Sequence, residues 1–320
     1  MYRLTTILLL TLFFSALSNT VMALPKLLIK MHRDADNKTV YLVGDLHNEE
    51  LDTCEYYNPK KENFYQLLNT LKNKSNEKTM VITEMSERRH EMWSQNPALM
   101  PDLFLPRAAL HIKDTIEKEK IANFTYCTGD DVRFGNDIMG DLCLQLRNVK
   151  QSDLEQGFIP GSRLTSIADQ LCNPEKRCQL ITHFTFLNSQ LNSEGTILRE
   201  DKEPLYQYIQ DYLYKSNQFV SWLNLFASNE TDAPQKVIST LPRNQAFAIL
   251  YPPNLEAVTN IVKTDANNYV LYYGMQHIED TDGDENTSQI PSIQQMLTKL
   301  GFVMVASPSR ASDVDFSIFQ

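Results

Sequence analysis

The chain has 320 residues, of which 42% are hydrophobic and 22% are charged, and this balance is typical of a globular protein rather than a disordered one. Lys and Arg number 30 against 40 Asp and Glu, which gives a formal net charge of −10 at pH 7. An acidic balance argues against nucleic acid, and against an anionic membrane surface, as the main partner. The simplest explanation of the negative charge is that it keeps a folded protein in solution.

The first 23 residues have the pattern of a secretory signal peptide. Arg3 gives a positive start, an apolar stretch covers 7–17, and Val21 and Ala23 place small residues at the −3 and −1 cleavage positions. The apolar stretch is shorter than the roughly 20 residues of a spanning helix, so we expect no membrane span after cleavage. The mature chain is expected to begin near Leu24, in a secreted or periplasmic setting.

The cysteines agree with an oxidising compartment. Five are present, and all follow the predicted cleavage position. Cys172 and Cys178 flank a turn-prone stretch and are the candidate disulfide pair, although sequence alone leaves the connectivity open.

Predicted strands and helices alternate along most of the chain. Apolar runs at 27–32 and 39–43, separated by the turn-forming residues 34–37, indicate an initial hairpin. The alternation that follows predicts an α/β fold with a mainly parallel β-sheet flanked by helices. Further strands are predicted at 79–83, 121–127, 246–251, 269–273 and 302–305, and helices at 59–74, 107–120, 137–149, 255–262 and 293–300.

One segment departs from this alternation. Residues 150–242 carry few strand signals and a long helical periodicity, strongest at 175–191 and 203–226. We predict a helical insertion or cap over the site. The expected organisation is a signal peptide at 1–23, a first α/β part at 24–149, the insertion at 150–242 and a second α/β part at 243–320.

Polar side chains follow four of the predicted strands, at the point where each strand ends. Two of these strands share the pattern strand–Gly–x–x–His. Because open α/β sheets place ligand chemistry at the carboxyl ends of their strands, we expect these side chains to gather along one sheet edge. In chain order they are Asp45 and His47, Glu84, Asp131 and Arg133, and His277.

Two chemistries suit this set. A histidine paired with a carboxylate can take a proton from water, because its pKa lies near the working pH. Alternatively, His47, Glu84 and His277 can hold a divalent metal (Mn, Co or Zn) that lowers the pKa of its bound water. Arg133 would then orient a substrate carboxylate or stabilise an oxyanion.

Structural explanations also exist for these residues. A histidine after a strand is often a turn residue, and Asp131 with Arg133 is also explained as an ion pair that holds a loop. Glu84 is harder to explain in this way, because a charge directly after a buried strand is costly without a partner. Together with Asp45, the residues Asp131 and Arg133 are the candidates for substrate binding.

Short motifs of the chain resemble those of the erythromycin-esterase/ChaN/Tiki-TraB superfamily. They are Gly44–His47, Glu84 after a strand, Asp131–Arg133, and Gly274–His277 followed by a helix and Gly301–Val305. The resemblance covers the two α/β parts and not the helical insertion. Asp45 stands where many members carry Glu or Thr.

This superfamily includes hydrolases of esters and peptides, some of them metal-dependent, and a haem-binding lipoprotein. The resemblance therefore implies that His47, Glu84 and His277 are the catalytic candidates, supported by Arg133. Our leading hypothesis is an exported hydrolase of a small-molecule or peptide substrate, in which His47 and Glu84 activate water either directly or through a metal. His277 is then the second ligand or the proton donor. The alternatives are a haem- or metal-binding protein that uses the same histidines, and a secreted interaction protein with a degenerate site.

Overall fold

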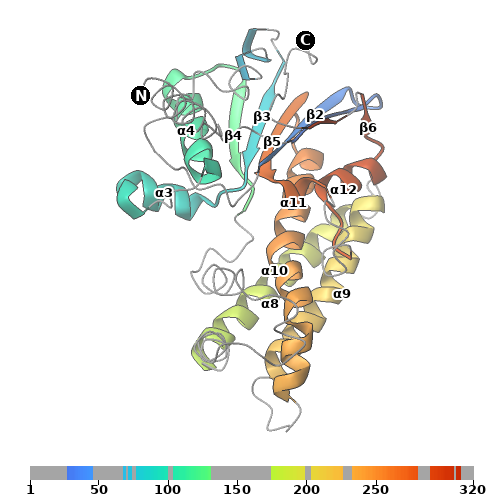
Figure 1. Ribbon diagram of the computed structural model, residues 1–320. Helices are drawn as coiled ribbons and strands as arrows, with labels where there is room; N and C mark the ends of the chain where they lie inside the picture. The colour runs from blue at the N-terminus through green and yellow to red at the C-terminus, as the bar shows by residue number, and fades with distance from the viewer. Residues whose placement is uncertain are drawn as a thin grey trace, which may run out of the picture.

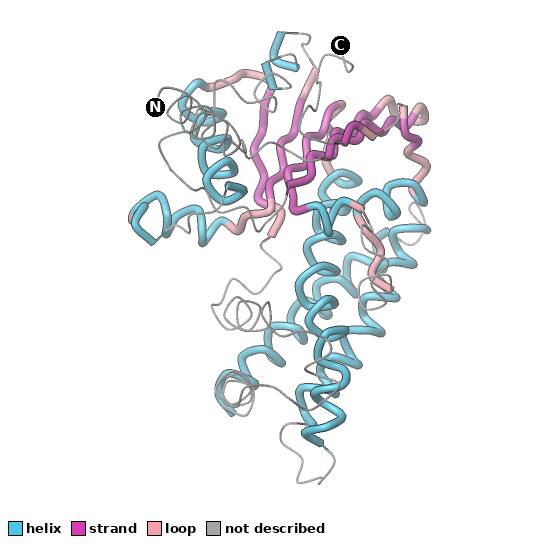
Figure 2. Tube along the Cα trace, in the orientation of Figure 1, coloured by secondary structure: helices cyan, strands magenta, loops and turns pink. Residues whose placement is uncertain are grey.

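The protein is described here by a computed structural model, in which a mixed and mostly parallel sheet is flanked by helices (Figures 1 and 2). The structure describes residues 27–45, 68–69, 71–73, 77–99, 104–130, 174–198, 203–225, 233–279, 289–305 and 308–310.

The described chain begins with a β-hairpin. Strands β1 (Leu27–Arg33) and β2 (Lys38–Asp45) pair antiparallel, with Leu27 opposite Gly44. Asn37, in the turn, has a φ of 52°, a left-handed conformation that asparagine tolerates better than most residues. The predicted hairpin is confirmed.

Four parallel strands form one side of the sheet, beginning with β2. Next to β2 lies β5 (Asn268–Gly274), followed by β3 (Thr79–Thr83) and the edge strand β4 (Phe124–Thr128), and each neighbouring pair is parallel. On the far side of β2, β1 pairs antiparallel with the short strands β6 (Val303–Met304) and β7 (Ser309–Arg310). The carboxyl ends of β2, β3, β4 and β5 therefore share one edge, and the predicted α/β class with a mainly parallel sheet is confirmed.

Helices cover both faces of this sheet. In the described part of the chain they include α3 (Glu87–Gln95), α4 (Phe104–Glu119), α8 (Pro174–Leu198), α9 (Glu203–Leu225), α10 (Ala233–Lys263), α11 (Met275–Ile278) and α12 (Ile293–Lys299). A 3-10 turn, η3, covers Pro97–Leu99.

The strand β5 shows how the two faces are divided. Its residues alternate between the faces, as the pleat of a strand requires. Val270 and Tyr272 pack in one apolar cluster with Ile112 of α4. Leu271 and Tyr273 belong to a second cluster, which includes residues of α9, α10 and α12. Both faces of β5 are therefore buried, which explains its nearly continuous run of apolar and aromatic residues.

The helices α8, α9 and α10 form a layer that extends away from the sheet (Figure 1). An aromatic cluster joins them: the ring centroids of Phe184 and Phe219 lie 4.7 Å apart, and those of Tyr212 and Phe247 lie 5.6 Å apart. The helices predicted at 175–191 and 203–226 are confirmed as α8 and α9. In the described part of the chain, no helix combines the length and the apolarity needed to cross a membrane.

The strand predicted at 246–251 is wrong, because these residues belong to α10, which also includes the helix predicted at 255–262. The predicted boundary at position 242 likewise falls inside this helix. The misleading signals are Pro242 and the pair Pro252–Pro253, which bound a short apolar run in the manner of turn residues. Proline costs about 3 kcal/mol in a helix interior, and burial of residues such as Tyr251 in the core offsets this cost.

Several sequence predictions lie outside the described residues. These are the signal peptide, the helix at 137–149 and most of the helix at 59–74, although residues 68–69 and 71–73 of the latter are helical. Cys178 lies on α8 as an exposed, free thiol, and Cys172 lies outside the described residues. The pairing of these two cysteines therefore stays a prediction.

Candidate functional site

Glu84 is held at the junction between two strands. It directly follows β3, and its backbone N–H donates to the carbonyl of Tyr272 on β5 at 3.0 Å, so it continues the ladder for one more residue. Its side chain then turns along the end of β5, where Oε2 accepts a hydrogen bond of 2.8 Å from the N–H of Gly274. The carboxylate is thereby fixed at the carboxyl edge of the sheet.

His277 lies on α11, the short helix that begins where β5 ends. Its Nε2 lies 3.2 Å from Oε1 of Glu84, and each of the two side chains is only 2% exposed. On the other side of the ring, Nδ1 lies 2.7 Å from Oδ1 of Asn254 on α10. Two strand ends and a helix therefore converge on one imidazole.

Asn254 determines the tautomer of this imidazole. Its Nδ2 donates to the carbonyl of Pro291 at 3.0 Å, so Oδ1 faces the ring and accepts a hydrogen bond from the N–H of Nδ1. In the neutral ring, Nε2 then presents a lone pair to Oε1 of Glu84. A contact of 3.2 Å between these two atoms requires a proton between them or a cation that both residues bind.

Asp45 ends β2 at the same sheet edge, opposite Gly274. It is buried, and its Oδ2 accepts a hydrogen bond of 2.9 Å from the hydroxyl of Tyr272. Tyr272 packs in the cluster on the α4 side, whereas His277 contacts Tyr273, which packs in the other cluster. Asp45 thus shares the edge with the Glu84–His277 pair, and its predicted role in substrate binding stays a prediction.

A second ion pair lies at the end of β4. The N–H of Gly129 donates to the carbonyl of Thr83 at 2.9 Å, which ties this end to the end of β3. The next residue, Asp130, places Oδ2 3.5 Å from Nη1 of Arg89 on α3. The side chain of Asp130 is 1% exposed and that of Arg89 is 27% exposed. The buried carboxylate therefore pairs with a guanidinium group that is partly open to solvent.

Tyr273 links the two ion pairs. Its hydroxyl donates to the carbonyl of Gly129 at 2.8 Å, and its ring centroid lies 5.7 Å from that of His277. Burial raises the pKa of Tyr273 well above its usual value, and the negative charges of Glu256, Asp130 and Glu84 raise it further. The phenol therefore stays neutral and acts as a hydrogen-bond donor.

The structure thus brings together Glu84 and His277, and it places Asp45 at the same edge. His47, Asp131 and Arg133 lie outside the described residues, so their roles stay predictions.

Sequence reasoning missed Asn254, Tyr273, Asp130 and Arg89. Asp130 was the easiest to find, because it follows a predicted strand in the same way as Asp131. Nothing in the sequence around Asn254 indicates its contact with His277.

A divalent metal fits the described residues in part. Two ligands at usual zinc distances in a tetrahedral site lie about 3.3 Å apart, close to the separation of Nε2 and Oε1, and a metal-bound histidine usually donates its other N–H to an oxygen, as His277 does to Asn254. The described residues contain no group of three His, Cys, Asp or Glu side chains that could hold a metal, so a third ligand would come from elsewhere. An axial haem ligand needs a free ring nitrogen, which would require His277 to leave Glu84.

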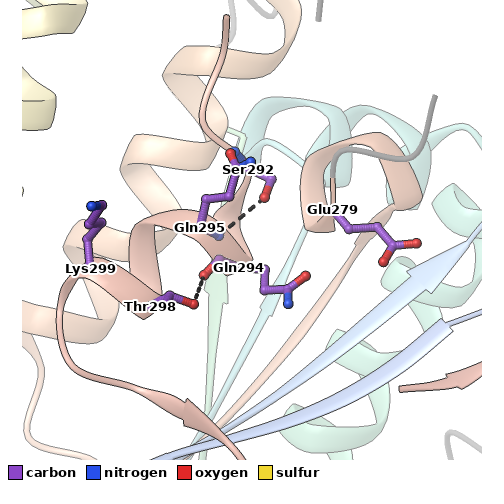
Figure 3. Close-up of a pocket in the computed structure, with 6 residues that line it drawn as sticks. All are labelled: Glu279, Ser292, Gln294, Gln295, Thr298 and Lys299. Atoms are coloured by element: carbon purple, nitrogen blue, oxygen red, sulfur yellow. Dashed lines mark hydrogen bonds between the residues drawn. The ribbon is translucent and has the colours of Figure 1, made fainter. Parts of the chain in front are cut away.

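A pocket of about 380 Å³ lies beside α11 (Figure 3). Glu279, two residues after His277, lines one side, and residues of α12 and its N-cap line the other. Neither Glu84 nor His277 lines this pocket. The lining residues are Glu279, Ser292, Gln294, Gln295, Thr298 and Lys299.

Comparisons of the chain with protein-family models, with curated proteins and with solved structures found no match.

Proposed function

We propose that this protein is an exported hydrolase that adds water to an ester or peptide bond, with Glu84 and His277 at its catalytic centre. The observation that carries the proposal is the 3.2 Å contact between Nε2 of His277 and Oε1 of Glu84. The two residues come from distant parts of the chain. Gly274, which ends the strand before His277, is 190 positions from Glu84 in the sequence. An acid–base pair oriented by a third group, here Asn254, is a recurring arrangement for activating a nucleophile.

The pair provides a complete path for the protons of a hydrolysis. The oxygen of a water molecule adds to the carbonyl carbon, and Glu84 accepts the proton that water loses. His277 gives the proton on Nε2 to the leaving oxygen or nitrogen as its bond to carbon breaks. Transfer of the first proton from Glu84 to His277 then restores the starting state. His47 is the predicted partner of Glu84 in activating the water.

Burial of the pair has two consequences for this chemistry. Electrostatic interactions are stronger where water is excluded, so charges on Glu84 and His277 influence the reaction more than they would at the surface. Both side chains are covered, and turnover therefore requires that part of the cover move aside to admit substrate and water.

In the alternative form of this proposal, the same residues are ligands of a divalent metal, and the metal takes the place of the proton on Nε2 of His277. Glu84 and His277 would hold it, and His47 is the predicted third ligand. Such a metal would supply a more acidic water molecule and polarise the carbonyl group of the substrate. The resemblance of the chain's motifs to the erythromycin-esterase/ChaN/Tiki-TraB superfamily supports this proposal, because that superfamily includes metal-dependent hydrolases.

The proposal is tested with the mature protein, residues 24–320, on a panel of p-nitrophenyl esters and peptides, with and without Mn²⁺, Co²⁺ or Zn²⁺. We expect Glu84→Gln and His277→Gln each to lower kcat by about 10²- to 10⁴-fold, as is usual for loss of a general acid or base. His32→Gln is the matched control, because His32 pairs with Thr39 at the opposite edge of the sheet. Circular dichroism establishes that each variant is folded. Wild-type activity in a folded Glu84→Gln or His277→Gln protein would overturn the proposal.

A further inference from the structure

We propose that Arg89 binds the carbonyl oxygen of the substrate and stabilises the negative charge that develops on it when water adds. This inference depends on the proposed function, and it assigns to Arg89 a role that the sequence predicted for Arg133. It also specifies the substrate class, which is an uncharged ester or amide.

Arg89 is positioned at the sheet edge where Glu84 lies. It lies in the first turn of α3, five residues after Glu84, and its backbone N–H donates to the Oγ of Ser86, which caps the helix. Its guanidinium group reaches the end of β4, which is joined to the end of β3 by the hydrogen bond from Gly129 to Thr83. The guanidinium group of Arg89 and the carboxylate of Glu84 therefore lie at the same edge of the sheet, where the parallel strands end.

The two side chains of the Arg89–Asp130 ion pair differ in their exposure to solvent. Asp130 is buried and contacts Nη1 of Arg89 at 3.5 Å, whereas the arginine side chain is 27% exposed. Among the described residues, Asp130 is the only acidic group within ion-pair distance of Arg89. A guanidinium group has several N–H donors in a fixed planar array, so one contact leaves others available for an oxygen atom of a substrate.

The charge of the surroundings selects between an anionic and a neutral substrate. Glu84, Asp130 and Glu256 all lie near enough to Tyr273 to raise its pKa by their charge. These carboxylates repel a substrate that is already anionic. A neutral carbonyl group meets no such repulsion, and it gains a negative oxygen only in the transition state, when Arg89 stabilises it most.

The competing explanation is that Arg89 only tethers α3 to the end of β4. Kinetics distinguish the two roles. We compare the wild type with Arg89→Lys, Arg89→Gln and Arg88→Gln on the p-nitrophenyl ester with the highest activity. Arg88 is the matched control, because it is an exposed arginine of the same helical turn.

We expect Arg89→Gln to lower kcat by about 10²-fold while KM changes less than about threefold, because loss of one oxyanion donor typically has this effect. Arg89→Lys should retain part of kcat, and Arg88→Gln should match the wild type. Three outcomes would overturn the inference: an unchanged kcat, a raised KM with an intact kcat, or a loss of activity that matches a loss of folded protein.

A binding measurement separates this inference from the proposed function. Methyl phenylphosphonate mimics the transition state, because its tetrahedral phosphorus carries a single negative charge on the oxygens that Arg89 would contact. Trp93 on α3 reports its binding by fluorescence in a Trp222→Phe background, which removes the other tryptophan. We expect binding in this background that Arg89→Gln abolishes and Arg88→Gln preserves. If this pattern holds and the wild type hydrolyses no substrate, the proposed function fails while the oxyanion site stands. If Arg89→Gln binds as tightly as Arg88→Gln, the inference fails, and the hydrolase proposal still depends on the Glu84 and His277 variants.

Discussion

Oδ1 of Asn254 lies 2.7 Å from Nδ1 of His277, and the amide that carries this oxygen is itself fixed by the carbonyl of Pro291. This relationship orients the imidazole so that its other nitrogen faces Glu84. A helix that packs against the sheet therefore controls the reactive group at the end of a strand.

Asn254→Leu should destabilise the protein. The variant leaves Nδ1 of His277 and the carbonyl of Pro291 without their partner, and an unsatisfied buried group costs about 1–3 kcal/mol. Urea denaturation measures the change in the free energy of unfolding. Asn260→Leu is the control on the same helix, because among the described residues the side chain of Asn260 makes only a long contact, 3.6 Å, to Sγ of Cys127. Equal losses in the two variants would show that the contact to His277 adds no stability.

The contact between Glu84 and His277 should appear as a coupling energy. In a double-mutant cycle of Glu84→Gln and His277→Gln, we expect the double variant to be more stable than the sum of the single effects predicts, by about 1–3 kcal/mol. The control is Lys78 with Asp265, an ion pair at 3.1 Å whose side chains are 67% and 99% exposed. Exposed pairs of this kind contribute about 0–1 kcal/mol. Additive effects of Glu84→Gln and His277→Gln would contradict the buried ion pair.

Gly129→Ala should be destabilising because Tyr273 occupies the space beside it. A Cβ atom at position 129 would lie 2.7 Å from Cγ2 of Ile82 and 2.9 Å from Cζ of Tyr273. Overpacking of this kind costs about 1–3 kcal/mol, measured as the free energy of unfolding in urea. Removal of the phenol oxygen in Gly129→Ala/Tyr273→Phe should relieve part of the strain.

Gly44→Ala is the comparison for this experiment. A Cβ atom there would meet its nearest neighbours, Cβ of Leu27 and the side chain of Met275, at 3.1 Å, so the cost should be smaller. A greater loss in Gly44→Ala than in Gly129→Ala would contradict the packing described around Tyr273.

The stability of the protein should fall as the pH drops below 6.5, in part because of His90. Its Nδ1 lies 3.1 Å from Nζ of Lys113, and an ammonium group can only donate, so Nδ1 must accept. Burial and the charge of Lys113 lower the pKa of His90 below its usual value of 6.5, although Glu87, Asp114 and Glu117 act in the opposite direction. As the pH falls below 6.5, His90 is therefore protonated in the unfolded chain before it is protonated in the folded protein. The stabilisation is fully present above pH 6.5 and decreases as the pH falls from there towards the folded pKa.

Urea denaturation between pH 5 and 7.5 measures this effect. We expect His90→Gln and Lys113→Met each to reduce the slope of the unfolding free energy against pH below 6.5. Lys78→Met is the control, because Lys78 is an exposed lysine that pairs with Asp265. A wild-type slope in His90→Gln would show that this histidine makes no contribution.

Local sequence patterns predicted the fold where they agreed with the packing. The strand β5 is buried on both faces and reads as an uninterrupted apolar run, and Gly274 marks its end clearly. Of helix α10, only residues 255–262 were predicted as a helix. Its prolines indicate breaks, and only the packing of residues such as Phe247 and Tyr251 against α9 explains why the helix continues.

The site was predictable to the extent that topology alone determines it. Glu84 and His277 follow parallel neighbouring strands, so their meeting follows from the strand order. Asn254 reaches His277 from the middle of a helix, and Arg89 reaches Asp130 from the helix after β3. Contacts of these two kinds depend on how helices pack and leave no periodic signal in the sequence.

The paired prolines of α10 have a mechanical consequence for the site. Pro252 and Pro253 have no N–H, so the carbonyls of Ala248 and Ile249 lose the bonds that would otherwise run along the helix axis. The helix α10 is therefore most easily bent about one turn before Asn254. This point lies between the residues that pack against α9 and the last residues of the helix, which precede β5. Any force that tilts the outer half against the inner half acts first on the amide that aims His277 at Glu84.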